Sequence, residues 1–326
     1  MLQNFIEPAL HNLTSPAILF FGLGLVASLL RSDLAIPEAT AKLLAVYLLL
    51  SIGFRGGTEL AHHGIDGRML AALGAGAALS FATPFAAFAV LRATTTLRPV
   101  DAAAVAAHYG SISIVTFIAA SNALDRQSIT YEGFMVGVAA AMETPAIVAA
   151  LLIAQRSGAG SSRPTAALWR EVILNGSVVV LIGALFIGIV SGERGAALLR
   201  PFTNELFPGF LCLFLLDMGL LVGRGLEQGR QHLAMPAGLF ALGMPLLGAA
   251  AGGLLAMPIG LSPGGTALLM TLAASASYIA VPAALRLALP DANPSIGLTL
   301  SLGVTFPFNL VVGIPLYTAV AAWIAG

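Results

Sequence analysis

Two short serine clusters lie in the middle of apolar stretches and carry the clearest chemical signal in the sequence. Ser111-Ile112-Ser113 follows Gly110, and Ser275-Ala276-Ser277 precedes Tyr278. A helix interrupted at such a place frees backbone N–H groups and presents a half-helix N-terminus, whose partial positive charge favours an anion. Small residues also allow unbroken helices to pack closely. Each cluster alone therefore leaves both interpretations open.

As a pair, the two clusters favour a binding site. Matching interruptions in the two halves of a chain are the best sequence indication of a transporter site. We therefore predict that a small anion binds between residues 110–113 and 275–278. The predicted substrate-binding residues are Gly110, Ser111, Ser113, Ser275, Ala276, Ser277 and Tyr278.

Glu143 is a carboxylate in the middle of another apolar stretch. A charged group inside a membrane costs a few kcal/mol, so its default interpretation is functional. Pro145 cannot donate a backbone hydrogen bond and leaves a carbonyl free, and Thr144 adds a hydroxyl. Oxygen groups of this kind suit a hard cation such as sodium. The alternative is a protonated Glu143 that is hydrogen-bonded to a neighbouring helix.

The second half offers oxygen groups at a related place, around Pro307. Together the two halves predict a sodium site formed by Glu143, Thr144, Thr305 and Asn309.

Three other polar positions allow weaker interpretations. His108 is either a proton carrier or a buried neutral histidine that is bonded to a backbone carbonyl. Asp217 lies towards one end of an apolar stretch, near Arg224, and is expected at the membrane interface. Arg55 and Glu59 are expected to form a solvated pair at the opposite end of theirs.

Composition defines the class of protein. The chain has 326 residues, of which 58% are hydrophobic and 9% charged, whereas a soluble domain carries roughly a quarter charged residues. With 15 basic and 15 acidic residues the formal net charge is zero. These values exclude an ordinary soluble enzyme, a basic nucleic-acid binder and a disordered chain. The single cysteine, Cys212, allows no intrachain disulfide.

Long runs without charged residues indicate a polytopic membrane protein. Residues 233–285 contain no Asp, Glu, Lys or Arg, and a bilayer span needs about 20 apolar residues. All spans should be helices, because an isolated strand leaves its backbone groups unpaired in lipid. The spans predicted are 16–31, 38–55, 69–92, 101–122, 131–154, 168–190, 201–222, 233–257, 264–289 and 295–323.

The distribution of basic residues predicts the orientation. The side predicted to be cytoplasmic carries Arg31, Lys42, Arg92, Arg98, Arg156, Arg163, Arg170, Arg224, Arg230 and Arg286; the other carries Arg55, Arg68, Arg126, Arg194 and Arg200. Both termini are then extracytoplasmic, in a plasma or inner membrane. The Gly/Ser-rich linker around residues 156–167 is cytoplasmic.

The linker separates two halves, 1–155 and 168–326, that resemble each other. Leu50–Gly53, Ser111–Ser113 and Glu143–Pro145 have counterparts 166, 164 and 162 residues later. Five spans in each half require the second half to insert upside down, and such inverted repeats are common in secondary transporters. Chance similarity between two Ala/Gly/Leu-rich halves is the alternative.

Several stretches resemble the sodium-dependent bicarbonate transporter family (SbtA-type permeases). They are Ile36–Glu38, Ile52–Gly57, Met142–Ala146, Asp291–Ser295, Gly303–Pro307 and the two serine pairs. They cover residues 36–316 in order.

This resemblance implies a homotrimer of ten-span protomers with a bile-acid-symporter-like fold. A core of spans 3–5 and 8–10 would slide against a gate of spans 1, 2, 6 and 7, as in an elevator. Broken spans 4 and 9 would cross at a bicarbonate site. Ser111, Ser113, Ser275 and Ser277 would bind the substrate, and Glu143 would help hold sodium.

Two departures from the family pattern bear on the details. This chain has Tyr278 where the family's cyanobacterial form has an acidic residue, which affects cation count and substrate identity. Its linker is also shorter, which affects regulation by a PII-type partner.

The leading hypothesis is sodium-coupled bicarbonate import, with no cofactor beyond the coupling ion. The alternatives are a sodium symporter for a small organic carboxylate, or a cation/proton antiporter using Glu143 and His108. The spans contain no pair of carboxylates suited to catalysis, which argues against an enzyme.

Overall fold

The computed structural model describes residues 14–63, 66–156, 174, 176–229, 234–279, 281–282, 284–285 and 289–325. Within these residues the chain consists of helices and loops, without β-strands. This confirms the all-helical class predicted from the apolar runs. Most of the predicted linker, together with Arg163, Arg170, Arg230 and Arg286, lies outside the described residues.

Eight helical stretches of the described chain are long and apolar enough to cross a membrane. Two further apolar helices, α2 and α13, are shorter. The helices are α2 (Pro16–Leu29), α3 (Glu38–His63), α4 (Gly67–Thr94), α5 (Pro99–Gly110), α6 (Ile114–Arg126), α7 (Met135–Ala141), α8 (Pro145–Arg156), α10 (Gly176–Arg200), η1 (Pro201–Glu205), α11 (Phe207–Gly229), α12 (Met235–Ile259), α13, which is Pro263–Ala274, α15 (Pro294–Leu300), η3 (Ser301–Thr305), α16 (Phe306–Phe308), η4 (Asn309–Gly313) and α17 (Ile314–Ala325).

Most predicted spans coincide with helices, but the sixth and seventh were wrong in position. The sixth was predicted at 168–190, whereas α10 continues to Arg200, and the seventh was predicted from 201, whereas α11 begins at Phe207. The charged residues Glu193 and Arg194 were taken as the end of a span. The chain instead bends at Gly192, whose φ of 54° only glycine adopts readily, and then continues as a helix.

Helix starts follow the usual capping chemistry. Asp66 caps α4 by accepting a 2.8 Å hydrogen bond from the N–H of Met69. That bond and the neighbouring Arg68 lower the pKa of the Asp66 carboxyl below its ordinary value. Ser15 caps α2 and is followed by Pro16 at the first helical position, where the missing N–H costs nothing.

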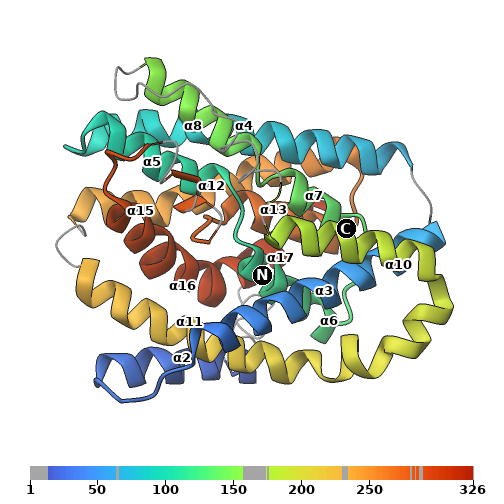
Figure 1. Cartoon of the computed structure of the whole chain (residues 1–326). Coiled ribbons are helices and arrows are strands. Elements are labelled where there is room, and N and C mark those ends of the chain that lie inside the picture. The colour runs from blue at the N-terminus through green and yellow to red at the C-terminus, as the bar shows by residue number, and fades with distance from the viewer. Residues whose placement is uncertain are drawn as a thin grey trace.

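The helices pack in two sets (Figure 1). In the first set, α2 lies along α11 at the bottom of the view, and α3 lies along α10. In the second set, α4 packs on α5 and α8, and α12 packs on α13 and α4. The second set also includes α6, α7 and α15, which pack on α13, α4 and α5 respectively. The two sets meet where α10 contacts α7 and where α11 contacts α15.

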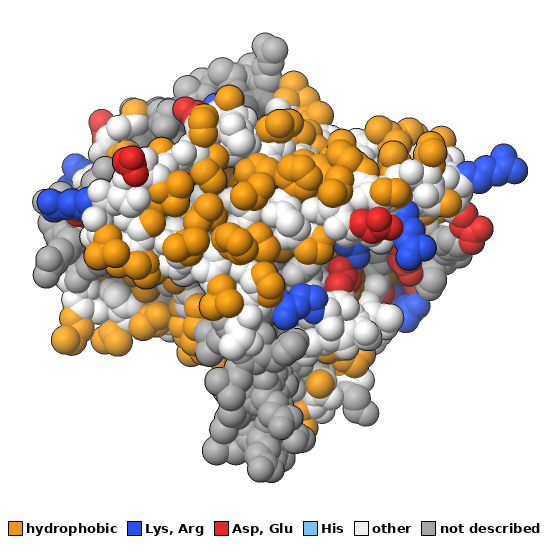
Figure 2. Space-filling model, turned by 90° about the horizontal axis from the view of Figure 1, so that it is seen from below, with side chains coloured by type: hydrophobic (Ala, Val, Ile, Leu, Met, Phe, Trp, Pro, Cys, Tyr) orange, Lys and Arg blue, Asp and Glu red, His pale blue; other side chains and the backbone are white. Residues whose placement is uncertain are grey.

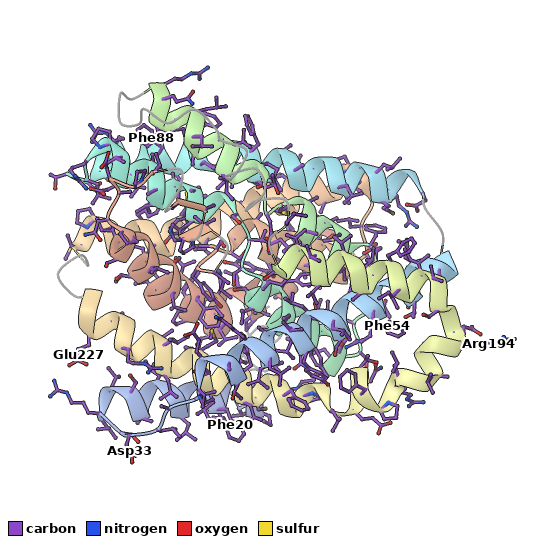
Figure 3. All side chains as sticks on the ribbon, viewed as in Figure 1. Phe20, Asp33, Phe54, Phe88, Arg194 and Glu227 are labelled. Carbon is purple, nitrogen blue, oxygen red and sulfur yellow. The ribbon has the colours of Figure 1, made fainter. Side chains whose placement is uncertain are left out.

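Charged side chains gather towards the two ends of the helices. Seen from below, the face around α2 and α11 has hydrophobic side chains across its middle and most Lys, Arg, Asp and Glu near opposite edges (Figure 2). Figure 3 places Asp33 and Glu227 at one edge and Arg194 at the other. This is the pattern of a protein whose apolar belt faces lipid.

The first helix set depends on glycines that let backbones approach. A Cβ added at Gly188 of α10 would lie 3.0 Å from the Cα of Gly57 and 3.0 Å from the N of Thr58, both on α3. Small residues at such crossings are the main means of tight helix association in membranes.

We therefore expect Gly188→Ala to destabilise the protein, because the new methyl group forces α3 and α10 apart. Overpacking of this kind costs about 1–3 kcal/mol. The measurement is the apparent Tm of purified protein in detergent. Gly183→Ala on the same helix is the matched control, since a Cβ there meets nothing within 4 Å. Equal Tm values for the two variants would contradict this role of Gly188.

Candidate functional site

The first serine cluster interrupts a helix. α5 ends at Gly110, and Ser111 follows with extended backbone angles (φ −90°, ψ 152°). Ser113 then caps α6, its hydroxyl oxygen accepting hydrogen bonds from the N–H of Thr116 (3.2 Å) and from its hydroxyl (2.9 Å). The N-terminus of α6 consequently lies inside the protein, among residues that are all buried.

The second serine cluster has the same local form. α13 ends at Ala274, and Ser275 follows with extended angles (φ −82°, ψ 163°). Residues 275–277 are not helical, and short helical pieces recur at 281–282 and 284–285. Both preceding helices are 12 residues long and begin with a proline, Pro99 in α5 and Pro263 in α13.

Backbone hydrogen bonds join the two interruptions directly. The N–H of Ser277 donates to the carbonyl of His108 (2.8 Å) and to that of Ser111 (3.2 Å). The N–H of Ser113 donates to the hydroxyl oxygen of Ser275 (2.9 Å). His108 Nδ1 lies 2.6 Å from the carbonyl oxygen of Ser277, so Nδ1 carries the proton and donates. The polar groups freed by one interruption are thus largely paired by the other.

This pairing selects between the two interpretations of His108. Its side chain is 1% exposed and is bonded to a backbone carbonyl. The buried neutral histidine is therefore the one that the structure supports.

A small cavity lies beside the two interruptions. It has about 10 Å³ of free space, enough for about one water molecule. Its lining joins both serine clusters, the predicted cation residue and the first turn of α10: Ile112, Ser113, Ile114, Glu143, Ser177, Ser277, Tyr278 and Ile279. Of the predicted substrate-binding residues, Ser113, Ser277 and Tyr278 line it.

Glu143 reaches this cavity from the non-helical residues between α7 and α8. Its side chain is 7% exposed. No hydrogen bond or ion pair to its carboxylate occurs within the described part of the chain, so the alternative bond to a neighbouring helix is not observed there. A carboxyl group facing a cavity without a protein partner is placed to bind something that enters.

The other predicted substrate-binding residues do not line the cavity. Ser275 is engaged within the protein, because its hydroxyl accepts from Ser113 and donates to the carbonyl of Leu272 (2.8 Å). Gly110 lies against Pro84 and Ala146, and Ala276 is buried. The hydroxyl oxygen of Ser111 is buried without a hydrogen-bond partner in the described structure.

The remaining predicted sodium ligands are not among the cavity-lining residues either. Thr305 donates to the carbonyl of Ala241 (2.7 Å) and contacts the Tyr109 hydroxyl (2.7 Å). Asn309 donates to the carbonyl of Ala274 (2.9 Å) and accepts from Tyr317, also at 2.9 Å. These two residues flank Pro307 in the π-helical turns η3 and η4, an irregularity that is frequent at functional sites.

Two polar contacts that the sequence did not suggest hold the half-helices from opposite ends. Asp101 at the start of α5 binds Arg98 through both oxygens (2.6 and 3.0 Å) and accepts from the N–H of Asn293 at 2.8 Å. Glu132, before α7, accepts from the N–H (2.7 Å) and hydroxyl (3.0 Å) of Ser262, the cap of α13. Only three-dimensional contact reveals these partners, which lie far apart in sequence.

Tyr278 and Ser177 also line the cavity. Tyr278 stacks edge-on against Phe306, with ring centroids 5.4 Å apart, and its hydroxyl lies 3.9 Å from the sulfur of Met218 on α11. Ser177 was missed by the sequence analysis, because one serine near the start of an apolar helix carries no distinguishing signal.

Two of the weaker sequence interpretations concern Asp217 and Arg55. Asp217, expected at the membrane interface, is 3% exposed and lies on α11, which extends beyond it to Gly229. Arg55, expected to pair with Glu59, forms an ion pair with Asp125 of α6 at 2.6 Å and also interacts with the charge of Glu59. A helix that runs on to His63 places Arg55 within α3, facing a neighbouring helix.

A comparison with known protein families identifies the family to which the chain belongs. The sequence model of the Na+-dependent bicarbonate transporter superfamily matches residues 16–322. The chain belongs to this superfamily. The resemblance stated from the motifs is thereby confirmed, and the protein is an integral membrane protein of a transporter family. A search of curated proteins found no match.

The His108–Ser277 contact gives a test of the joined interruptions. We expect His108→Leu to lower stability, because the Ser277 carbonyl then lacks its buried donor; an unsatisfied group of this kind costs about 1–3 kcal/mol. His108→Asn should recover part of the loss, since its amide can donate from nearly the position of Nδ1. The apparent Tm of the purified variants measures both, and an Asn variant no more stable than the Leu variant would contradict the assignment.

Proposed function

We propose that this protein imports bicarbonate together with sodium, as a secondary active transporter. Membership of the superfamily supports the pair of solutes. The single observation that carries the proposal is the cavity where Ser113 and Ser277, from the two interruptions, face the unpartnered carboxyl group of Glu143.

The chemistry of the cavity suits a small oxyanion. Bicarbonate has oxygens that accept hydrogen bonds and one hydroxyl that donates, so serine hydroxyls can serve it in either direction. The 13-residue helix α6 begins at the cavity and contributes the positive end of its dipole. The unpartnered hydroxyl of Ser111 is a further group that a ligand would satisfy. A cavity with room for one water molecule requires side chains to move when bicarbonate binds.

The same small cavity favours bicarbonate over a larger organic carboxylate. The antiporter alternative required His108 to carry protons, but the Nδ1 proton of His108 is donated to the Ser277 carbonyl, which argues against that role. Glu143 then remains as the group that interacts with the cation.

We propose that sodium is held by Glu143 and Thr144, with Thr305 and Asn309 contributing from the second half of the chain. Binding of the last two residues requires them to exchange their present hydrogen bonds. Sodium beside bicarbonate also cancels the electrical cost of import. Moving one negative charge against an interior-negative potential costs about 2.3 kcal/mol per 100 mV.

We propose ten spans arranged as two inverted repeats of five, with helices 4 and 9 interrupted at the site. The matching forms of α5 and α13 support this arrangement. The two helices have equal length, begin with a proline, and are followed by a three-residue segment with a serine at each end that starts in extended conformation. The contacts Asp101–Asn293 and Glu132–Ser262 support it too, because each ties the start of one half-helix to a loop of the other half.

Movement between two bodies would give alternating access. We propose that the core (spans 3–5 and 8–10) slides against the gate (spans 1, 2, 6 and 7), as in an elevator. The closer packing within each set supports this division. Assembly as a homotrimer and extracytoplasmic termini are parts of the same proposal, and the short linker leaves regulation by a PII-type partner open.

Uptake by purified protein in liposomes tests the function. We expect labelled bicarbonate to accumulate when an inward sodium gradient is imposed. Replacing external sodium with choline should reduce uptake to the level of protein-free liposomes. Uptake that is equal in sodium and choline would contradict the coupling, and strong competition by acetate or lactate would favour the carboxylate alternative.

The role of Glu143 has its own test. We expect Glu143→Gln to raise the KM for sodium at least tenfold, because Glu143 is the charged group among the described residues that line the cavity. Asp217→Asn is the matched control, since Asp217 is also buried but does not line the cavity. A sodium KM that is the same in Glu143→Gln and in the unmodified protein would refute a sodium ligand at this position.

A further inference from the structure

A second and larger cavity opens between the two helix sets, at the end of the molecule that carries Arg55 and Arg200. It has a volume of about 620 Å³, within the range of ligand pockets. We call it the outer vestibule; it is lined by α3, α6, α10, η1 and residues 128–133, and its charged residues are Arg55, Glu59, Asp125 and Arg200.

The vestibule extends to side chains close to the first interruption. Its lining includes Phe117 and Ser121, which are 0% and 2% exposed and lie on α6. Phe117 donates its backbone N–H to the carbonyl of Ser113 (3.1 Å), one turn earlier. One lining residue of the vestibule, Phe117, thus lies one helical turn from Ser113, which lines the serine cavity.

Arg55 is a charged group of the vestibule whose hydrogen bond to Asp125 leaves further N–H donors. One of its terminal nitrogens binds one Asp125 oxygen at 2.6 Å, and its guanidinium carbon lies 5.9 Å from the ring centroid of Phe207. A guanidinium has five N–H donors, and the Asp125 contact uses one of the terminal nitrogens of Arg55. The side chain is 28% exposed, so its free edge is accessible.

Net charge alone does not draw anions into the vestibule. Its two arginines and two carboxylates sum to zero. The Arg55–Asp125 pair is partly open to water, with side chains 28% and 32% exposed, so another carboxylate-like group can reach Arg55 and exchange with Asp125. Bicarbonate presents the same planar pair of oxygens that arginine binds in carboxylates.

We propose that the outer vestibule is a capture site for a small oxyanion, in which Arg55 exchanges Asp125 for incoming bicarbonate before it reaches the serine cavity. The proposal rests on the import function proposed above and adds a second anion site to it. Tyr131 lines the vestibule as a further donor, because burial, together with the charge of Asp125, raises the pKa of its hydroxyl to about 12 and keeps it protonated.

A different role for the same ion pair would be purely mechanical. Arg55 on α3 and Asp125 on α6 join the two helix sets, so the pair could simply hold one arrangement of gate and core. Loss of either partner would then have the same effect. Capture predicts opposite effects, because removal of Arg55 leaves the vestibule with net charge −1 and removal of Asp125 leaves it with +1.

The test is the KM for bicarbonate of Arg55→Gln and Asp125→Asn in proteoliposomes, at saturating sodium and at two ionic strengths. We expect Arg55→Gln to raise the KM about tenfold and Asp125→Asn to lower it about threefold, both differences shrinking at high salt. Arg194→Gln is the control, because it removes a positive charge at the same end but outside the vestibule lining. Its KM should be unchanged.

The outcomes separate the two proposals. Sodium-dependent uptake by the unmodified protein is measured first, and its absence would overturn the import function itself. If uptake is present, KM changes of the same sign in Arg55→Gln and Asp125→Asn would overturn capture and leave the import function standing. An unchanged KM in Arg55→Gln would also overturn capture.

Discussion

The structure depends on one constraint, which is that backbone N–H and C=O groups must be hydrogen-bonded where no water can reach them. Interrupting two helices within buried sequence leaves several such groups without partners. Here the partners come from the other interruption: Ser277 donates to His108, and Ser113 donates to Ser275. The two interruptions are therefore stable together and costly alone. Each interruption thus supplies hydrogen-bond partners for the other.

The rest of the second helix set keeps these ends in register. Asp101 and Glu132 fix the outer ends of α5 and α13 to loops of the other half of the chain. Pro99 and Pro263 begin the same two helices at the position where a backbone N–H would have no partner within the helix, so the N–H that proline lacks is not missed. With both ends of each 12-residue half-helix held, the backbone at the two serine clusters keeps its position beside the cavity.

The sequence predicted much of this because the signals were local. Runs without charges located most helices, and the serine pairs 164 residues apart fall in the non-helical residues 111–113 and 275–277. Where the signal was not local, the prediction was incomplete. Glu193 looked like the end of a helix, but a glycine bend allows α10 to continue. Ser275 was predicted to bind the substrate, and in the structure its hydroxyl donates to Leu272 and accepts from Ser113, contacts that the sequence does not indicate. The partners of Arg55 and Asp101 depend on how helices cross, which spacing along the chain does not encode.

The central claim is that the junction of the two interruptions holds the anion. The most direct measurement is a pair of cryo-EM maps of the protein in lipid nanodiscs with sodium, one with bicarbonate and one with an impermeant anion. The account predicts added density between residues 110–113 and 275–278, within hydrogen-bond distance of Ser113 and Ser277. Identical maps at that junction, or helices continuous through both serine clusters, would contradict it.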